Sequence, residues 1–345
     1  MSTFKKYWWK LSGAGLVAFS VVMSFITPLS PGITEVSPAS IAAGPATLTV
    51  KGYHTNFSTG TNSFWLTANG RKFQLQGKVI SVNSPGEATV AFNIPAELPA
   101  NDLDLVSDHP GDGTSVLRSA VFVKDVKVTP GLANASGTEI TDHQPSHFTF
   151  PFKTILYETI RNLNFHVTMW FALLFCMLAS VIKSIAYLSK GNLKSDREAL
   201  EGVNVGLLFG ILGLITGSIW ARFTWGAWWV NDTKLNGAAI SVLIYLAYLL
   251  LRNSIGEEQK RARIVAVYNI FAFVMLIVFI QVLPRMTDSL HPGNGGNPAF
   301  SQYDLDNNMR MIFYPAVLGW MLIGAWIINL RSRWSHLNHR IHHHA

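Results

Sequence analysis

Residues 165–188 read FHVTMWFALLFCMLASVIKSIAYL, and Lys183 is the one charged side chain in this stretch. About 20 mostly apolar residues suffice for a helix to cross the hydrocarbon core of a membrane. Five other stretches have the same character, and the six predicted spans are 8–27, 165–188, 203–221, 237–251, 264–283 and 309–330. The composition agrees, since 49% of the 345 residues are hydrophobic, 14% are charged, and the mean hydropathy is +0.26. The sequence therefore predicts a polytopic membrane protein.

Basic residues gather at both termini and in every second connection between spans. They are Lys5, Lys6, Lys10, Lys190, Lys194, Arg197, Arg252, Lys260, Arg261, Arg263, Arg331, Arg333 and Arg340. The opposite segments are less basic, and residues 33–145 hold seven Lys/Arg against ten Asp/Glu. We expect a bacterial inner-membrane protein, and the positive-inside rule predicts that both of its termini lie in the cytoplasm and residues 33–145 outside it. The same pattern supports the short fourth span, and it explains the net charge of +7 without a nucleic-acid partner.

The first span has an alternative interpretation as a cleaved signal peptide, because lysines precede its apolar stretch. That stretch is longer than is usual for such a peptide, and no small-x-small cleavage site follows it directly. We therefore expect a retained anchor.

Cys176 is the one cysteine and lies within a predicted span, so we expect it to pack in the core. Without a C-x-x-C-H motif the chain has no site for covalent heme attachment.

Residues 33–145 differ from the spans because they alternate apolar and polar side chains over short runs. The predicted strands are 47–52, 64–67, 72–82, 88–94, 103–106 and 119–128. Turn signals such as Asn69-Gly70 and Pro85-Gly86 separate them. This spacing predicts an antiparallel β-sandwich, and residues 47–110 resemble immunoglobulin-like TIG domains. We expect His54 and His109 to be ordinary surface histidines and 129–150 to be a linker.

Three groups of chemically distinctive residues fall in segments that the predicted topology places outside the membrane. They are His166 at the end of the second span, the tryptophan-rich segment 225–232, and His291 between the fifth and sixth spans. Each group alone has an ordinary explanation, because tryptophans form interfacial belts and single histidines are usually solvated. Together they suit heme, since two imidazoles can ligate the iron axially and tryptophans can contact the porphyrin. Arg222 is a candidate partner for a heme propionate.

Three segments resemble the cytochrome c assembly family of heme-handling membrane proteins. TGSIWARFTWGAWWVNDTKLNGAAI at 216–240 resembles its tryptophan-rich WWD signature, most closely that of the CcmC branch. ETIRNLNFHVTMWFALLF at 158–175 and DSLHPGNGG at 288–296 resemble the outer segments that hold its two histidines. The resemblance implies that His166 and His291 are the axial ligands of a non-covalent heme b. It also implies that Trp225, Trp228, Trp229 and Asp232 hold the porphyrin.

Two features depart from the family pattern. Asn231 stands where a third tryptophan usually precedes the acid, and the first outer loop is expanded by residues 33–145. The fold class we predict is therefore an all-α polytopic membrane protein of six helices with an inserted, extracytoplasmic, all-β immunoglobulin-like sandwich. Its expected segments are the anchor 1–32, the β-domain 33–145, the linker 146–164, the five-helix heme-handling domain 165–331 and the cytoplasmic tail 332–345.

The resemblance implies a cofactor-handling protein, not an enzyme, that delivers heme to a CcmE-like chaperone with help from a CcmAB-like ATP-binding-cassette complex. One alternative is a CcsA-type cytochrome c synthase, but the middle of each predicted span lacks the histidine expected of one. Another is a heme permease, which usually has polar groups near the membrane midplane. Asn204 and Asn269 are the few polar candidates, and we expect both to lie near span ends.

Overall fold

The computed structural model describes residues 2–136, 140–291 and 305–344. The chain forms two compact units, which are considered separately below. The helix unit comprises Met1–Ile26 and Thr159–Ala345, and the β unit comprises Thr27–Glu158. The predicted combination of a six-span membrane protein and an inserted all-β domain is confirmed, because six helices are long and apolar enough to cross a membrane and the strands follow the first of them.

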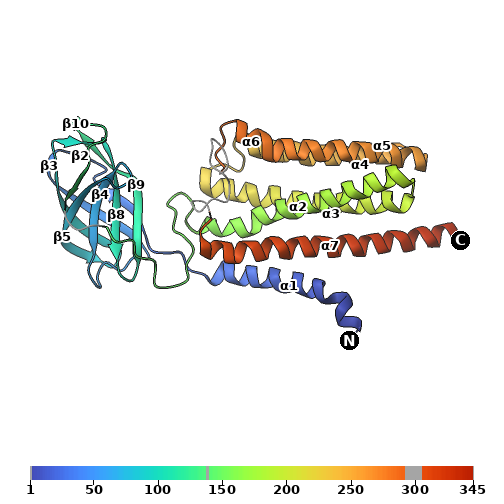
Figure 1. Cartoon of the computed structure of the whole chain (residues 1–345), viewed down its shortest axis with the longest axis horizontal. Coiled ribbons are helices and arrows are strands. Elements are labelled where there is room, and N and C mark those ends of the chain that lie inside the picture. The colour runs from blue at the N-terminus through green and yellow to red at the C-terminus, as the bar shows by residue number, and fades with distance from the viewer. Residues whose placement is uncertain (1, 137–139, 292–304, 345) are drawn as a thin grey trace. The chain divides into compact units, whose positions relative to one another are not determined.

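The helices of the helix unit run side by side in Figure 1. They are α1 (Ser2–Ile26), α2 (Leu163–Lys190), α3 (Leu193–Trp225), α4 (Thr233–Ser254), α5 (Glu258–Ile277), α6 (Leu283–Met286) and α7 (Asn307–His344). A 3-10 turn (Tyr157–Asn162) precedes α2, and a π-turn (Val278–Val282) joins α5 to α6. The fourth predicted span is longer than expected, because α4 has 22 residues. Residues 332–344, expected as a tail, continue α7.

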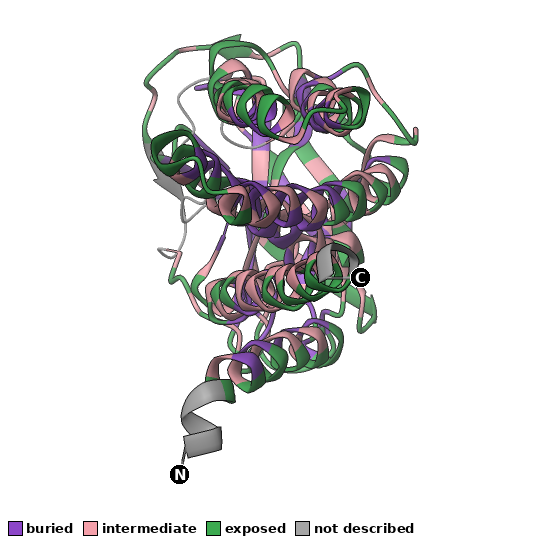
Figure 2. Cartoon of the chain, turned by 90° about the vertical axis from the view of Figure 1, so that its right-hand side faces the viewer, coloured by how far each residue is buried: buried purple, intermediate pink, exposed green. Residues whose placement is uncertain are grey.

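Large apolar side chains cover the outer surface of these helices. Leu243 and Leu250 on α4 and Phe223 on α3 are all more than 60% exposed. Figure 2 shows the buried residues facing the neighbouring helices and the exposed ones facing outward. A soluble protein rarely exposes so much apolar surface, whereas a bilayer solvates it. The helix unit is therefore that of a multi-pass membrane protein.

Glycines let α3 lie close against α2. The facing pairs along α3 are Gly206 with Met177, Gly210 with Leu173, Gly213 with Trp170 and Gly217 with His166. At each of these glycines an added Cβ would lie less than 3 Å from the α2 side chain. Small residues at such spacing allow the close approach on which helix packing in membranes depends. The stripe thereby fixes the register of the two helices and brings His166 against the C-terminal half of α3.

The first helix packs against the last in the same way. An added Cβ at Gly13 would lie 2.8 Å from Leu322, and one at Gly319 would lie 2.9 Å from Val17. The Ser20 hydroxyl donates to the Ile312 carbonyl at 3.2 Å. Hence α1 is an integral part of the helix unit.

One end of the helix unit, which we call the basic end, contains the α2–α3 and α4–α5 turns. Gly191 ends α2 in the left-handed conformation, with φ of 64°, and the Asn192 side chain caps α3. Arg252 donates to both oxygens of the buried Asp196. Such a buried pair is neutral overall, so both charges are compensated within the protein. The opposite end, which we call the tryptophan end, contains the α3–α4 loop.

Asn269 corrects one expectation. It is fully buried and lies well inside the continuous helical segment Glu258–Met286, so it is not near a span end. Its side-chain amide donates to Ser180 at 2.7 Å and Ser184 at 2.9 Å on α2. These bonds tie α5 to α2.

The β unit consists of one nine-stranded sheet and a separate two-stranded sheet, in which β7 pairs with β10. Its strands are β1 (Gly32–Ser37), β2 (Ser40–Ala42), β3 (Gly44–Tyr53), β4 (Ser63–Ala68), β5 (Phe73–Ser84), β6 (Glu87–Ile94), β7 (Glu97–Leu98), β8 (Asp102–His109), β9 (Gly113–Lys124), β10 (Lys127–Val128) and β11 (Asn134–Ser136). The main path is β1-β3-β6-β5-β4-β8-β9-β2. The long strand β5 belongs to both halves, since residues 73–77 pair with β4 and 78–84 with β6. Three short strands, β2, β10 and β11, pair in parallel, which the alternation of side chains did not predict.

Two parts of the β unit differ from the sequence expectation. His109 is a buried structural residue, because its Nε2 lies 2.7 Å from the Thr59 carbonyl and its Nδ1 accepts from Asp112 N at 3.0 Å. The predicted linker 129–150 includes β11 and is fastened to the sheet. There, His143 Nδ1 lies 2.8 Å from Asp108, and its carbonyl accepts from Thr114 N at 2.9 Å.

We expect residues 27–158, expressed without the helices, to fold as a soluble β protein. The reason is that the unit has its own core, in which Leu48, Phe64, Leu66 and Val90 are fully buried. Far-ultraviolet circular dichroism and a cooperative thermal transition test this expectation. A helical spectrum, or a heme absorption band after incubation with hemin, would contradict the assignment of this unit as a β-domain outside the heme site.

Candidate functional site

The α3–α4 loop at the tryptophan end is fixed by caps on both sides. Gly226 ends α3 with φ of 80°, a left-handed conformation that favours glycine, and Arg222 donates to its carbonyl. Asp232 begins α4, and its Oδ1 accepts from the backbone of Lys234 at 2.9 Å and Leu235 at 3.2 Å. The exposed Arg222 thus stabilises the loop that contains the tryptophans of the predicted heme site.

Asp232 also holds the segment that carries His291. Its Oδ2 accepts from the Leu290 backbone at 2.7 Å and from the Ser289 hydroxyl at 2.8 Å, and its Oδ1 lies 3.0 Å from His291 Nδ1. Burial raises the pKa of this carboxyl, but the hydrogen bonds from His291, Leu290 and Ser289 outweigh burial and hold the pKa well below its usual range. The group is therefore an ionised carboxylate, and it links two segments 59 residues apart.

The bond to Asp232 fixes the tautomer of His291. A carboxylate accepts only, so Nδ1 of the imidazole must be the nitrogen that carries the proton. The Nε2 lone pair is then available to a ligand such as a metal ion. Trp225 packs edge-on against this ring, with centroids 5.1 Å apart. The cluster therefore presents one imidazole nitrogen in a defined orientation.

His166 has the same tautomer as His291, with the proton on Nδ1, but a different group accepts the hydrogen bond from it. Its Nδ1 lies 3.0 Å from the Gly213 carbonyl and 3.2 Å from the Thr216 hydroxyl of α3. A carbonyl also only accepts, so Nδ1 again carries the proton and the Nε2 lone pair is available. Trp220 packs edge-on against the ring at 5.8 Å, and its indole N–H donates to the Thr159 hydroxyl at 3.2 Å.

Helix α3 connects the two histidines. The His166 ring contacts Gly217 and the His291 ring contacts Trp225, eight residues further along α3, which is about 12 Å of helix rise. The structure thus brings Trp225, Asp232 and His291 into contact, and it places His166 beside α3 about two helical turns before Trp225. Two oriented imidazoles with aromatic neighbours are a donor set that fits heme iron, because a metal-bound histidine ordinarily donates its other N–H to a carboxylate or carbonyl.

Trp228 and Trp229 lie on the outer surface of the loop. They are 58% and 43% exposed, which leaves flat aromatic area available to a ligand. The Trp228 carbonyl accepts from the Ser218 hydroxyl at 2.8 Å, and the Trp229 indole N–H donates to Asn236 Oδ1 at 3.2 Å. Asn236 also donates to Asn231 at 2.8 Å. Asn231 therefore helps to orient Trp229 through Asn236.

A π-turn lies just before the His291 segment. Val278–Val282 adds one residue to a helical turn, which rotates the chain that follows relative to a regular α-helix. At Gly237, five residues after Asp232, an added Cβ would lie 2.5 Å from the Phe279 carbonyl oxygen. This contact packs the start of α4 against the π-turn. The segment that carries Asp232 and the segment that leads to His291 are therefore in contact at a second place.

Several residues that support the site were not predicted from the sequence. They are Gly213, Gly217, Trp220, Asn236 and Ser289. The Gly213-x-x-x-Gly217 spacing is a helix-packing signal that predicts a close neighbour for α3. No comparable signal identifies Trp220, Asn236 or Ser289, because their roles depend on contacts between segments distant in sequence.

We expect Gly217→Ala to lower heme affinity about tenfold or more, the effect usual for loss of a contact that orients a metal ligand. The new methyl group would lie 2.6 Å from His166 Cε1, so the imidazole would have to move. Gly206→Ala is the matched control, because it lies in the same stripe but meets the flexible end of Met177. Heme titration of the purified variants measures both, and equal affinities would contradict the His166 placement.

Comparison with known proteins finds relatives that take part in cytochrome c biogenesis. The chain is 41% identical over 87 residues to the cytochrome c biogenesis protein CcsA of Prochlorococcus marinus, 25% of this chain and 27% of that protein. It is 35% identical over 88 residues to CcsA of Synechococcus sp., 26% of this chain and 28% of that protein. The chain thus spans about a quarter of the length of these curated relatives. The model of the family "CcmC: Heme exporter protein C" matches residues 141–345. Because this match covers more than half of the chain, the protein belongs to the heme exporter protein C family of cytochrome c biogenesis.

Proposed function

We propose that this protein holds heme b non-covalently at the outer face of the bacterial inner membrane. His166 and His291 are its axial ligands. The observation that carries the proposal is that both imidazoles hold Nδ1 against an acceptor, Gly213 and Asp232 respectively, so that the lone pair of Nε2 would be available to the iron. Non-covalent binding follows from the lack of a C-x-x-C-H motif in the sequence.

The outer location rests on charge. Lys190, Lys194 and Arg252 lie at the basic end of the helix unit, which the positive-inside rule places in the cytoplasm. The tryptophan end, with both histidines, then faces outward, and so does the β unit that the chain inserts after α1. Trp225, Trp228 and Trp229 contact the porphyrin, and Arg222 has guanidinium N–H groups that can bind a propionate.

We propose that the protein delivers this heme to a CcmE-like heme chaperone. A CcmAB-like ATP-binding-cassette complex would support its release. The exposed tryptophans favour transfer because a ligand bound at the surface can be passed on without unfolding the site. ATP hydrolysis would take place in another chain, since this sequence has no Walker motif.

A second candidate is a CcsA-type synthase that joins heme to apocytochrome thiols. The 87-residue similarity to CcsA favours it, although that similarity covers only 27% of the relative. A transfer assay separates the two functions. The purified protein, loaded with heme, is mixed with either an apo-chaperone or a reduced apocytochrome that contains C-x-x-C-H. We expect heme to move to the chaperone. Formation of thioether-linked heme on the apocytochrome by this protein alone would refute the chaperone-delivery proposal.

A further inference from the structure

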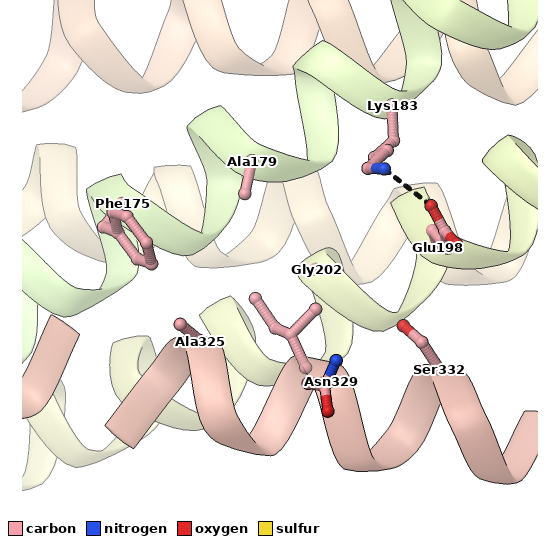
Figure 3. A pocket seen from close by; sticks show the side chains of 9 residues that line it. Phe175, Ala179, Lys183, Glu198, Gly202, Ala325, Asn329 and Ser332 are labelled. Atoms are coloured by element: carbon pink, nitrogen blue, oxygen red, sulfur yellow. Dashed lines mark ion pairs between the residues drawn. The ribbon is translucent and has the colours of Figure 1, made fainter. Parts of the chain in front are cut away.

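A groove of about 270 Å³ lies between α2, α3 and α7 and extends toward the basic end of the helix unit (Figure 3). None of its lining residues belongs to the proposed heme site. Its walls change character along their length. Phe175 and Ala179 on α2 and Ala325 on α7 line the inner part, which is apolar. Lys183 and Ser332 lie further toward the basic end.

The spacing of these residues matches the depth of a membrane leaflet. Lys183 lies eight residues beyond Phe175 on α2, about 12 Å along the helix axis. Phe175 is near the middle of α2, and Lys183 is seven residues from its end at Lys190. The groove therefore runs from the hydrocarbon core toward the level of the lipid headgroups.

The charged groups around the polar end leave an excess of one positive charge. Glu198 is the shared acceptor: Lys183 Nζ lies 2.7 Å from it and Lys194 Nζ lies 4.0 Å from it. His336 Nε2 also lies 3.4 Å from Glu198. Arg331 is paired with Glu201, so this second pair adds no net charge. Two lysines against one carboxylate attract a single anion, and Asn329 and Ser332 supply uncharged donors beside them.

We infer that this groove binds one anionic phospholipid. Its phosphate lies beside Lys183 and Ser332, and an acyl chain lies along Phe175 and Ala325. Both halves of the groove are needed for this ligand, because a free phosphate gains nothing from the apolar wall and an uncharged lipid gains nothing from the extra lysine. Anionic lipids of the cytoplasmic leaflet meet basic residues at this depth, and each such residue contributes about a fivefold increase in binding. The site is independent of heme binding.

Native mass spectrometry of the full-length, detergent-purified protein tests this inference. The probes are phosphatidylglycerol, phosphatidylcholine and inorganic phosphate. We expect one retained phosphatidylglycerol, a weaker response to phosphatidylcholine, and no displacement by excess phosphate. Lys183→Gln is expected to lower phosphatidylglycerol binding about fivefold. Ala179→Phe fills the apolar part and is expected to abolish retention of both lipids.

Lys190→Gln is the matched control, because Lys190 is an exposed lysine on the same helix that does not line the groove. We expect its lipid binding to equal that of the wild type. Equal binding of the two lipids, equal losses in Lys183→Gln and Lys190→Gln, or displacement by inorganic phosphate would each overturn the inference. Retention of lipid in Ala179→Phe would also overturn it. Because the readout is bound lipid and not heme, none of these results bears on the proposed heme site.

Discussion

Replacement of His166 or His291 by glycine is expected to lower the heme content of the purified protein more than any other single change. Each substitution removes an axial ligand, so the loss should exceed the roughly 10–100-fold effect of altering a group that merely orients a metal ligand. The double variant should retain less heme than either single variant. Heme content per polypeptide, measured as the pyridine hemochrome, gives the result.

Added imidazole makes this experiment specific. A His→Gly change leaves a space that free imidazole can enter, which restores the ligand without restoring its connection to the chain. We therefore expect imidazole to recover part of the heme in each single variant. His336→Gly is a matched control, because His336 lies on α7 at the basic end and contacts Glu198. A loss of heme in His336→Gly equal to that in His291→Gly would mean that the substitutions act through folding alone.

Asp232→Asn is expected to have the second largest effect, because one carboxylate receives hydrogen bonds from both the start of α4 and the His291 segment. Asparagine retains an oxygen that can cap α4, since it is as good an N-cap as aspartate. Its amide nitrogen cannot accept from the Leu290 N–H, so the His291 segment loses a contact. We expect heme to remain bound through His166, with ligation by His291 weakened about 10–100-fold and delivery to the chaperone lost.

Asp232→Ala separates the two roles of this residue. It removes the N-cap as well, at a typical further cost of about 1 kcal/mol in stability. Thermal unfolding and heme spectra of both variants should therefore diverge, with a lower melting temperature in Asp232→Ala than in Asp232→Asn. An unchanged iron ligand spectrum in both variants would contradict the role of Asp232 in orienting His291.

Most of the helix unit could be predicted from its sequence, because an apolar run long enough to cross a membrane has few other uses. The length of α4 could not. Its first turn, Thr233–Asn236, is mostly polar, and its extension depends on the cap from Asp232. In the β unit, alternation predicted β3, β4, β5, β6 and β8 and the second half of β9, but it missed the first half of β9. It could not predict that β5 pairs with both halves of the sheet or that β11 joins it, because strand pairing is a property of distant segments.

The proposed heme site could likewise be predicted only in part. The charge distribution predicted that His166, the tryptophans and His291 lie on one side of the membrane. The resemblance to a known family gave them roles, but the sequence could not show what holds each imidazole. Asn269 is instructive, because its position near the start of an apolar run gave no sign that Ser180 and Ser184 bind it in the core.

The electron paramagnetic resonance spectrum of the ferric heme, recorded for the full-length wild type and for His291→Gly, tests the central claim most directly. Two histidines on one iron predict a low-spin spectrum of a six-coordinate, bis-imidazole heme in the wild type. The same claim predicts a high-spin spectrum in His291→Gly and recovery of the low-spin signal when imidazole is added. Identical spectra in the two proteins would contradict it, and His291 would then not be a ligand of the iron.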